Sequence, residues 1–80
     1  MTVTVLFFGH YRDLVGDEMC LTTAQNATLQ TLLAQLSASD SRLDTLPQIC
    51  RFAINEEYAP LETPLNDGDT VAVLPPMSGG

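Results

Sequence analysis

The sequence contains no lysine and no tryptophan, and it has very few positive charges of any kind. Its only strong cations are Arg12, Arg42 and Arg51, against 10 acidic side chains, so the formal net charge is −7 at pH 7. A surface of this charge repels the phosphate backbone of nucleic acids, which excludes DNA or RNA as a partner. The same charge suits contact with a basic protein surface, although it could equally serve solubility alone.

Cysteine and histidine are also scarce, and their spacing indicates no reactive centre. Cys20 and Cys50 form no CxxC pair, so neither a zinc site nor a disulfide framework is indicated, and we expect both to be small packing residues in strands. His10 is the only histidine, and no serine or cysteine is spaced from it as in a catalytic triad. We therefore expect no metal and no permanently bound cofactor.

Long apolar runs are absent as well, since none approaches the roughly 20 residues of a membrane span. The first residues lack the basic start and the cleavage site of a secretory signal. We therefore expect a soluble, cytoplasmic protein that does not enter a membrane. With 45% hydrophobic and 16% charged residues, the chain predicts one folded domain over residues 1–74, followed by a flexible tail over residues 75–80.

The hydrophobic pattern at the start of the chain predicts a strand. Residues 2–8 alternate with period two, which places Val3, Val5 and Phe7 on a core face and Phe8 on the more exposed face. Further strands are expected at residues 18–22, 50–55, 58–59 and 71–74. Tight turns are expected at residues 56–57 and 66–69, the latter at Gly68.

One segment has the pattern of a long amphipathic helix. Leucines at positions 29, 32, 33 and 36 form a single helical stripe, and Thr28 precedes it as a probable N-cap. A loop is expected at residues 37–41, and shorter helical turns at residues 11–16 and 42–46, the second ending before Pro47.

This order, β-β-α-β-β-β, predicts an α+β ubiquitin-like β-grasp fold, with a mixed sheet of four to five strands packed on one main helix. In that fold the last strand returns beside the first. The outward side chains of Phe8 and Leu74 would then lie close together, with Tyr58 nearby. Such an exposed apolar cluster indicates a docking surface, although single exposed apolar residues mean little.

The last six residues combine a stiff base with a tip that has no side chains. Pro75 and Pro76 favour an extended backbone that points the tail away from the body. Gly79 and Gly80 let a terminal carboxylate enter a narrow cleft that a Cβ would block. The reach is roughly 20 Å at ~3.3 Å per residue, enough for a partner's active site. Because the chain has no lysine, none of its side chains could capture an activated terminal carboxylate.

Together these residues resemble the sulfur-carrying small subunits of molybdopterin synthase, the MoaD type within the MoaD/ThiS family of β-grasp sulfur carriers. The resemblance covers the whole chain. Its landmarks are Val5-Leu-Phe-Phe-Gly-His-Tyr-Arg-Asp-Leu-Val-Gly16, Ile54-Asn55, Pro64-Leu-Asn-Asp-Gly-Asp-Thr-Val71 and Pro75-Pro-Met-Ser-Gly-Gly80. Two positions depart from the family pattern: Met77, where valine is common, and Leu74, where an aromatic residue can occur.

The resemblance implies a role without catalytic side chains of its own. An E1-like adenylyltransferase would use ATP to adenylate Gly80, and a sulfur donor would displace AMP to leave a thiocarboxylate. The large synthase subunit, in a heterotetramer, would then transfer this sulfur to cyclic pyranopterin monophosphate. Gly79 would share the reacting tip with Gly80. The residues expected to contact a partner are Phe8, Tyr58, Leu74, Pro75, Pro76, Met77 and Ser78.

Other functions remain compatible with the same residues. A β-grasp sulfur carrier could serve another acceptor, such as the thiamine thiazole or a cysteine precursor. A ubiquitin-like tag joined to lysines of target proteins would also end in two glycines. A purely structural interaction domain with a frayed, solvated tail is the plainest alternative.

Overall fold

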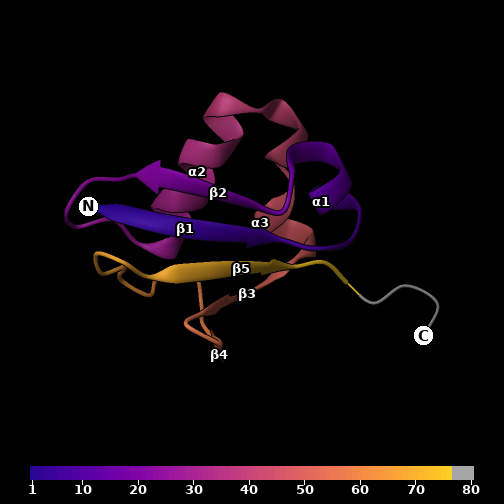
Figure 1. The fold of residues 1–80 in the computed structure, drawn as a ribbon. Coiled ribbons are helices and arrows are strands. Elements are labelled where there is room, and N and C mark those ends of the chain that lie inside the picture. Colours follow the sequence, from indigo (N-terminus) through magenta and orange to yellow (C-terminus); the bar gives the residue numbers. More distant parts are fainter. Residues whose placement is uncertain (77–80) are drawn as a thin grey trace.

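The computed structural model describes residues 1–76 of the chain, which form a sheet with helices packed across one face (Figure 1). The strands are Thr2–Phe7 (β1), Glu18–Thr22 (β2), Arg51–Ile54 (β3), Glu57–Tyr58 (β4) and Thr70–Leu74 (β5). The helices are Gly9–Val15 (α1), Leu29–Ser39 (α2), the 3₁₀ turn Ser41–Leu43 (η1) and Leu46–Ile49 (α3). A mixed five-stranded sheet with a main helix confirms the predicted α+β class.

The two strands at the middle of the sheet come from opposite ends of the chain. The spatial order is β2-β1-β5-β3-β4, and β1 and β5 are parallel while the other pairs are antiparallel. The register pairs Val5 with Val71 and Phe7 with Val73. The prediction that the last strand returns beside the first is therefore confirmed. Because β1 and β5 run in the same direction, both end at the same edge of the sheet.

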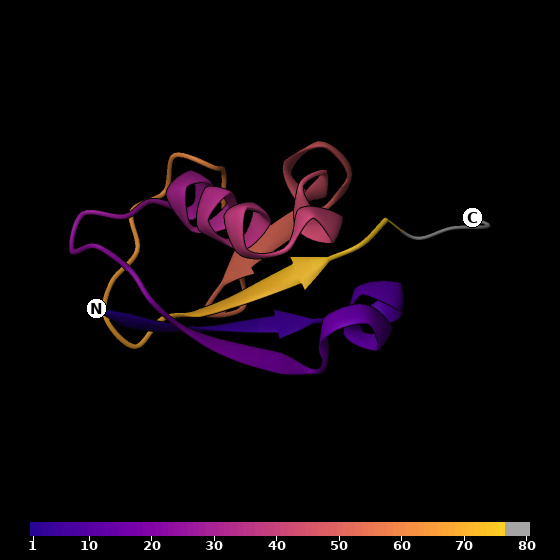
Figure 2. The same cartoon turned by 90° about the horizontal axis from the view of Figure 1, so that it is seen from above.

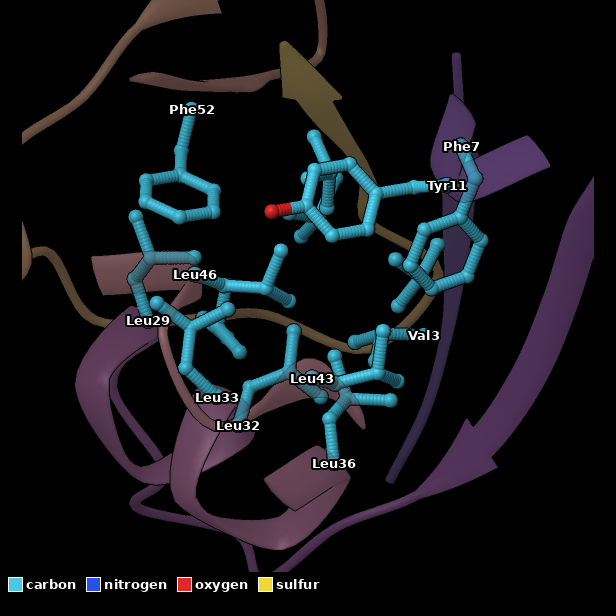
Figure 3. Close-up of a cluster of buried hydrophobic side chains, with 14 of the residues drawn as sticks. Val3, Phe7, Tyr11, Leu29, Leu32, Leu33, Leu36, Leu43, Leu46 and Phe52 are labelled. Atoms are coloured by element: carbon cyan, nitrogen blue, oxygen red, sulfur yellow. The ribbon is translucent and has the colours of Figure 1, made fainter. Parts of the chain in front are cut away.

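The hydrophobic core lies between the sheet and α2, as seen from above in Figure 2 and in close-up in Figure 3. Alternation along β1 is as predicted, since Val3, Val5 and Phe7 are each at most 1% exposed. The leucine stripe of α2 faces these side chains and is also buried. Tyr11 of α1 extends into the same cluster, toward Leu46 of α3 (Figure 3). The core therefore contains side chains from the sheet and from each of the helices.

Helix α2 begins where the sequence predicts and ends later. Thr28 is the N-cap: its hydroxyl accepts from the backbone N–H of Thr31, and the Thr31 hydroxyl in turn accepts from the N–H of Thr28. The loop expected at residues 37–41 is wrong, because the helix continues to Ser39. The hydroxyls of Ser37 and Ser39 donate to carbonyl groups three residues earlier, which lets both residues remain helical.

The helical turn expected to end before Pro47 is also misplaced. Pro47 lies in the first turn of α3, where a missing N–H costs nothing because no helical carbonyl precedes it. Leu43 of η1 and Leu46 of α3 are fully buried, so both short elements contribute to the core. The prediction had assigned the covering of the sheet to one helix alone. Strand β3 consequently starts at Arg51, one residue later than expected.

The turn expected at residues 56–57 lies one residue earlier. Asn55 and Glu56 both have positive φ, 51° and 72°, and they connect β3 to β4. The Asn55 amide donates to Asp69 Oδ1 at 2.9 Å, and its Oδ1 accepts from the backbone N–H of Thr70 at 3.0 Å. Asp69 is buried and also accepts from the backbone N–H of Asn66. This network joins two turns that are adjacent in space, and the turn expected at Gly68, with φ 86°, is confirmed.

Replacing Asn55 with alanine should test this network. The substitution removes both side-chain hydrogen bonds, leaves buried Asp69 with one donor fewer, and places alanine at positive φ. We expect the free energy of unfolding to fall by about 1–3 kcal/mol in urea denaturation. Asn66→Ala is the matched control and should change the free energy of unfolding by less than about 0.5 kcal/mol. Asn66 takes part in the network through its backbone N–H, which the substitution keeps. Equal losses in both variants would contradict the network's role.

Candidate functional site

A solvent-open depression lies beside the C-terminal ends of β1 and β5. Its volume is about 870 Å³, its lining is mainly apolar, and one of its residues carries a charge. We call it the β5 groove, and its lining consists of Phe8, Gly9, Ile49, Arg51, Tyr58, Leu74, Pro75 and Pro76. The structure therefore brings together all the partner-binding residues predicted within the described range. Their role in docking stays a prediction.

Two adjacent phenylalanines have different surroundings, since Phe7 lies in the core and Phe8 lines the groove. Phe7 ends β1 with its side chain buried, and Phe8 follows as the N-cap of α1 with its side chain 41% exposed. The extended backbone of Phe8, with φ −134° and ψ 165°, keeps the strand alternation for one more residue. Helix α1 starts at Gly9, two residues earlier than predicted, and stops at Gly16 as expected. Because α1 starts at Gly9, the chain changes direction directly after Phe8, beside the groove.

The strands β3, β4 and β5 supply the other wall. Leu74 is the last residue of β5 and points away from the core that holds its neighbour Val73. Arg51 is its register partner in β3. Tyr58 lies on the edge strand β4 and is 73% exposed, which is unusual for a large aromatic side chain.

The base of the tail is seated against α1. Gly9 has φ +59°, and a Cβ built on it would come within 3.1 Å of Pro75 Cγ. The missing side chain thus allows Pro75 to pack closely where the chain leaves β5. Pro76 is exposed and is the last residue that the structure describes. The predicted site residues Met77, Ser78, Gly79 and Gly80 lie outside the described residues.

Sequence reasoning missed three residues of the lining: Gly9, Ile49 and Arg51. Ile49 ends α3, the helix hidden by the misreading of Pro47, and it is 47% exposed. Alternation along β3 places Arg51 on the face of the sheet opposite Phe52, and that face was predictable from the sequence. Without the register of β3 against β5, however, its position beside Leu74 was not predictable.

The described residues offer little reactive chemistry. Residues 1–76 hold no cluster of three or more His, Cys, Asp or Glu side chains able to bind a metal. Burial raises the pKa of the Cys50 thiol, which lowers its thiolate fraction at neutral pH. Burial, together with the adjacent Cys50, also raises the pKa of Tyr11.

The expectation that Cys20 is a packing residue is wrong, because its side chain is exposed on β2 near the Thr4 hydroxyl. No helix in the described range is long and apolar enough to cross a bilayer.

The fold has clear counterparts among solved structures. SAMP1 from Haloferax volcanii superposes with a TM-score of 0.87 over 100% of both chains, at 21% identity. A chain in the complex of subunits 1 and 2 of molybdopterin-converting factor from Helicobacter pylori gives a TM-score of 0.71 over 100% of both chains, at 33% identity. With the sheet order described above, these likenesses define the class: the protein is a ubiquitin-like β-grasp domain.

The sequence relatives identify the family within that class. Residues 5–80 match the ThiS family. The molybdopterin synthase sulfur carrier subunit of Chlamydomonas reinhardtii is 39% identical over 83 residues, covering 100% of both chains. The subunit of the same name from Escherichia coli is 32% identical over 98% of this chain and 99% of its own length. The chain belongs to the ThiS family of sulfur carriers, and its curated relatives are MoaD-type subunits.

The two phenylalanines provide a stability test of the groove. Phe8→Ala should lower the free energy of unfolding by only about 1–2 kcal/mol, because part of its side chain is already in water. Phe7→Ala is the matched control and should lower it by about 3–5 kcal/mol, since it leaves a cavity in the core. Chemical denaturation midpoints of the two variants measure the difference. A large loss for Phe8→Ala would place its side chain in the core and remove it from the groove.

Proposed function

We propose that this chain is the sulfur carrier of molybdopterin synthase and that Gly80 holds the sulfur as a thiocarboxylate. The observation that supports this best is the position of the β5 groove, whose lining ends at Pro75 and Pro76, with two residues between Pro76 and Gly79 in the sequence. The family match extends to residue 80, so the segment carrying the chemistry is included in the likeness. In this proposal the β5 groove binds the partner, and the terminal segment delivers the sulfur.

The chemistry explains why a carrier needs an activating partner. A carboxylate is a poor electrophile, so an E1-like adenylyltransferase joins the Gly80 carboxylate to the AMP part of ATP and releases pyrophosphate. A sulfur donor then attacks the acyl carbon and expels AMP, which leaves the thiocarboxylate. ATP is bound by the activating enzyme, and this chain contributes only the acyl group.

Delivery takes place on the large subunit of molybdopterin synthase. The β5 groove docks on that subunit, and the segment after Pro76 enters its active site, where tethering raises the effective concentration of sulfur. The sulfur passes to cyclic pyranopterin monophosphate, and two such transfers build the dithiolene. The large subunit provides the catalytic side chains, and the carrier leaves with a carboxylate again. The H. pylori likeness supports this arrangement, since that structure is a complex of subunits 1 and 2 of molybdopterin-converting factor.

The alternatives receive less support from the same comparisons. The likeness to SAMP1, at 21% identity, shows the fold alone and carries no argument for a protein tag. The likeness to a ThiS protein of Geobacter metallireducens is also below 25% identity, with a TM-score of 0.63. Identities of 39% and 32% with named molybdopterin synthase carriers favour that acceptor over the thiamine thiazole or a cysteine precursor. We place the reaction in the cytoplasm, where both partner enzymes would need to act.

Removing Gly80 should abolish sulfur loading without affecting the fold. The full chain is incubated with the E1-like enzyme, ATP and a sulfur source, and its intact mass is measured for replacement of one carboxyl oxygen by sulfur. We expect no such replacement in the deletion variant, while its free energy of unfolding changes by less than about 0.5 kcal/mol. Asn66→Ala is the control, because Asn66 is exposed outside the β5 groove and the terminal segment, and this variant should be loaded with sulfur normally.

Two results would contradict the proposal. Normal molybdopterin formation by the Gly80-deleted chain would remove the terminus from the chemistry. A ladder of Gly80-dependent adducts on other proteins, seen in denaturing electrophoresis of cell extract, would favour the tag. Self-adducts through side chains cannot confuse that assay, because the chain has no lysine.

A further inference from the structure

Arg51 is the one charged residue in the lining of the β5 groove. It begins β3 and is exposed, while its neighbour Phe52 faces the core, so strand alternation places Arg51 on the opposite side of the sheet. Its register partner is Leu74, and the remaining lining is apolar apart from the Tyr58 hydroxyl and backbone groups. A guanidinium therefore stands within the surface that otherwise suits an apolar partner.

The other two arginines already have partners within the chain. Arg12 Nε lies 3.1 Å from Asp17 Oδ1, and Arg42 Nη2 lies 2.7 Å from Asp40 Oδ2. Hydrogen bonds from Arg42 also hold the pKa of Asp40 below its usual value. Among residues 1–76, Arg51 forms no ion pair of this kind, although the chain has 10 acidic side chains. Its charge is thus available to a group from outside the described part of the chain.

A partner that covers the β5 groove takes Arg51 out of water. Burying a charge without a counter-charge is strongly unfavourable, so an entirely apolar partner surface would bind less tightly at this point. The planar guanidinium matches a carboxylate with two parallel N–H···O bonds, which compensates the lost hydration. Acidic groups on a partner are repelled by most of the protein, because the whole chain has a net charge of −7, and they are attracted at Arg51.

We infer that Arg51 pairs with an Asp or Glu carboxylate of the large synthase subunit, next to the apolar side chains that this subunit places in the β5 groove. The inference rests on the proposed function and adds the chemistry of the partner's contact surface. The pair fixes the orientation of docking, because Arg51 begins β3 and Phe8 follows β1, and these two strands lie on opposite sides of β5 in the sheet. It also disfavours partners that lack a carboxylate at this point.

The test measures the affinity of the full-length carrier for the large subunit by calorimetry, at low and at high salt. Arg51→Gln should weaken binding by roughly 30-fold or more at low salt, because truncating one member of a buried charge pair leaves the other charge buried without a partner. The salt dependence of binding should be smaller in this variant than in the wild type. Arg12→Gln and Arg42→Gln remove the same charge outside the groove and should change the affinity by about twofold at most.

Four results would overturn the inference. Three concern affinity: wild-type affinity in Arg51→Gln, tighter binding in Arg51→Leu, or an equal loss in all three glutamine variants. An effect of Arg51→Gln confined to adenylation by the E1-like enzyme would also overturn it, by assigning the residue to the other partner. Arg51→Lys keeps the charge without the fork and should bind between the wild type and Arg51→Gln. Arg51→Lys provides a second measurement of the pair if Arg51→Gln folds poorly. Denaturation midpoints show whether Arg51→Gln is folded.

The outcome is separable from the proposed function. Normal affinity of Arg51→Gln, together with normal sulfur transfer, would remove the carboxylate pair and leave the carrier role intact. Failure of the wild-type chain to bind the large subunit at all would contradict both. Reversal of charge supplies the decisive pairing test, since Arg51→Glu should lose binding and regain part of it when the partner's carboxylate is replaced by arginine.

Discussion

The parallel pairing of β1 with β5 is the interaction on which the remaining structure depends. It joins the first and last strands and sets Phe7 opposite Val73, with both side chains in the core. Both strands then end at one edge, where Phe8 and Leu74 emerge together beside the base of the tail. A slip of one residue would reverse every side chain along β5 and exchange the groove for the core face. Stability and function therefore share a single register.

The division of the sheet into a covered and an open face gives this small domain its surface for partners. Helices α2 and α3 pack on one face of the sheet (Figure 2). The leucine stripe, Leu43 and Leu46 complete the core between them and the strands (Figure 3). The β5 groove collects side chains that point away from this core, and Gly9 leaves space for Pro75 at its end. The described body of the chain can thus act through the surface that it presents beside Pro75 and Pro76.

Much of this architecture could be predicted from local pattern. Alternation along residues 2–8 separated Phe7 from Phe8 correctly, and the leucine stripe with its Thr28 cap located α2. Pro47 was read as a stop, whereas helices also accept proline in their first turn, so α3 and Ile49 were missed. Arg51 was missed because its neighbours come from β5 and β4, and long-range register leaves no local signal. Residues 77–80 were assigned from sequence, and their roles stay predictions.

Reconstitution of the final transfer tests the central claim most directly. The chain carrying a thiocarboxylate at Gly80 is mixed with the large subunit and cyclic pyranopterin monophosphate, without the activating enzyme, ATP or another sulfur source. The account predicts that molybdopterin forms and that two carriers return to the carboxylate for each molecule made. Equal product from the unmodified chain, or no product from the thiocarboxylated chain in the assembled complex, would contradict it.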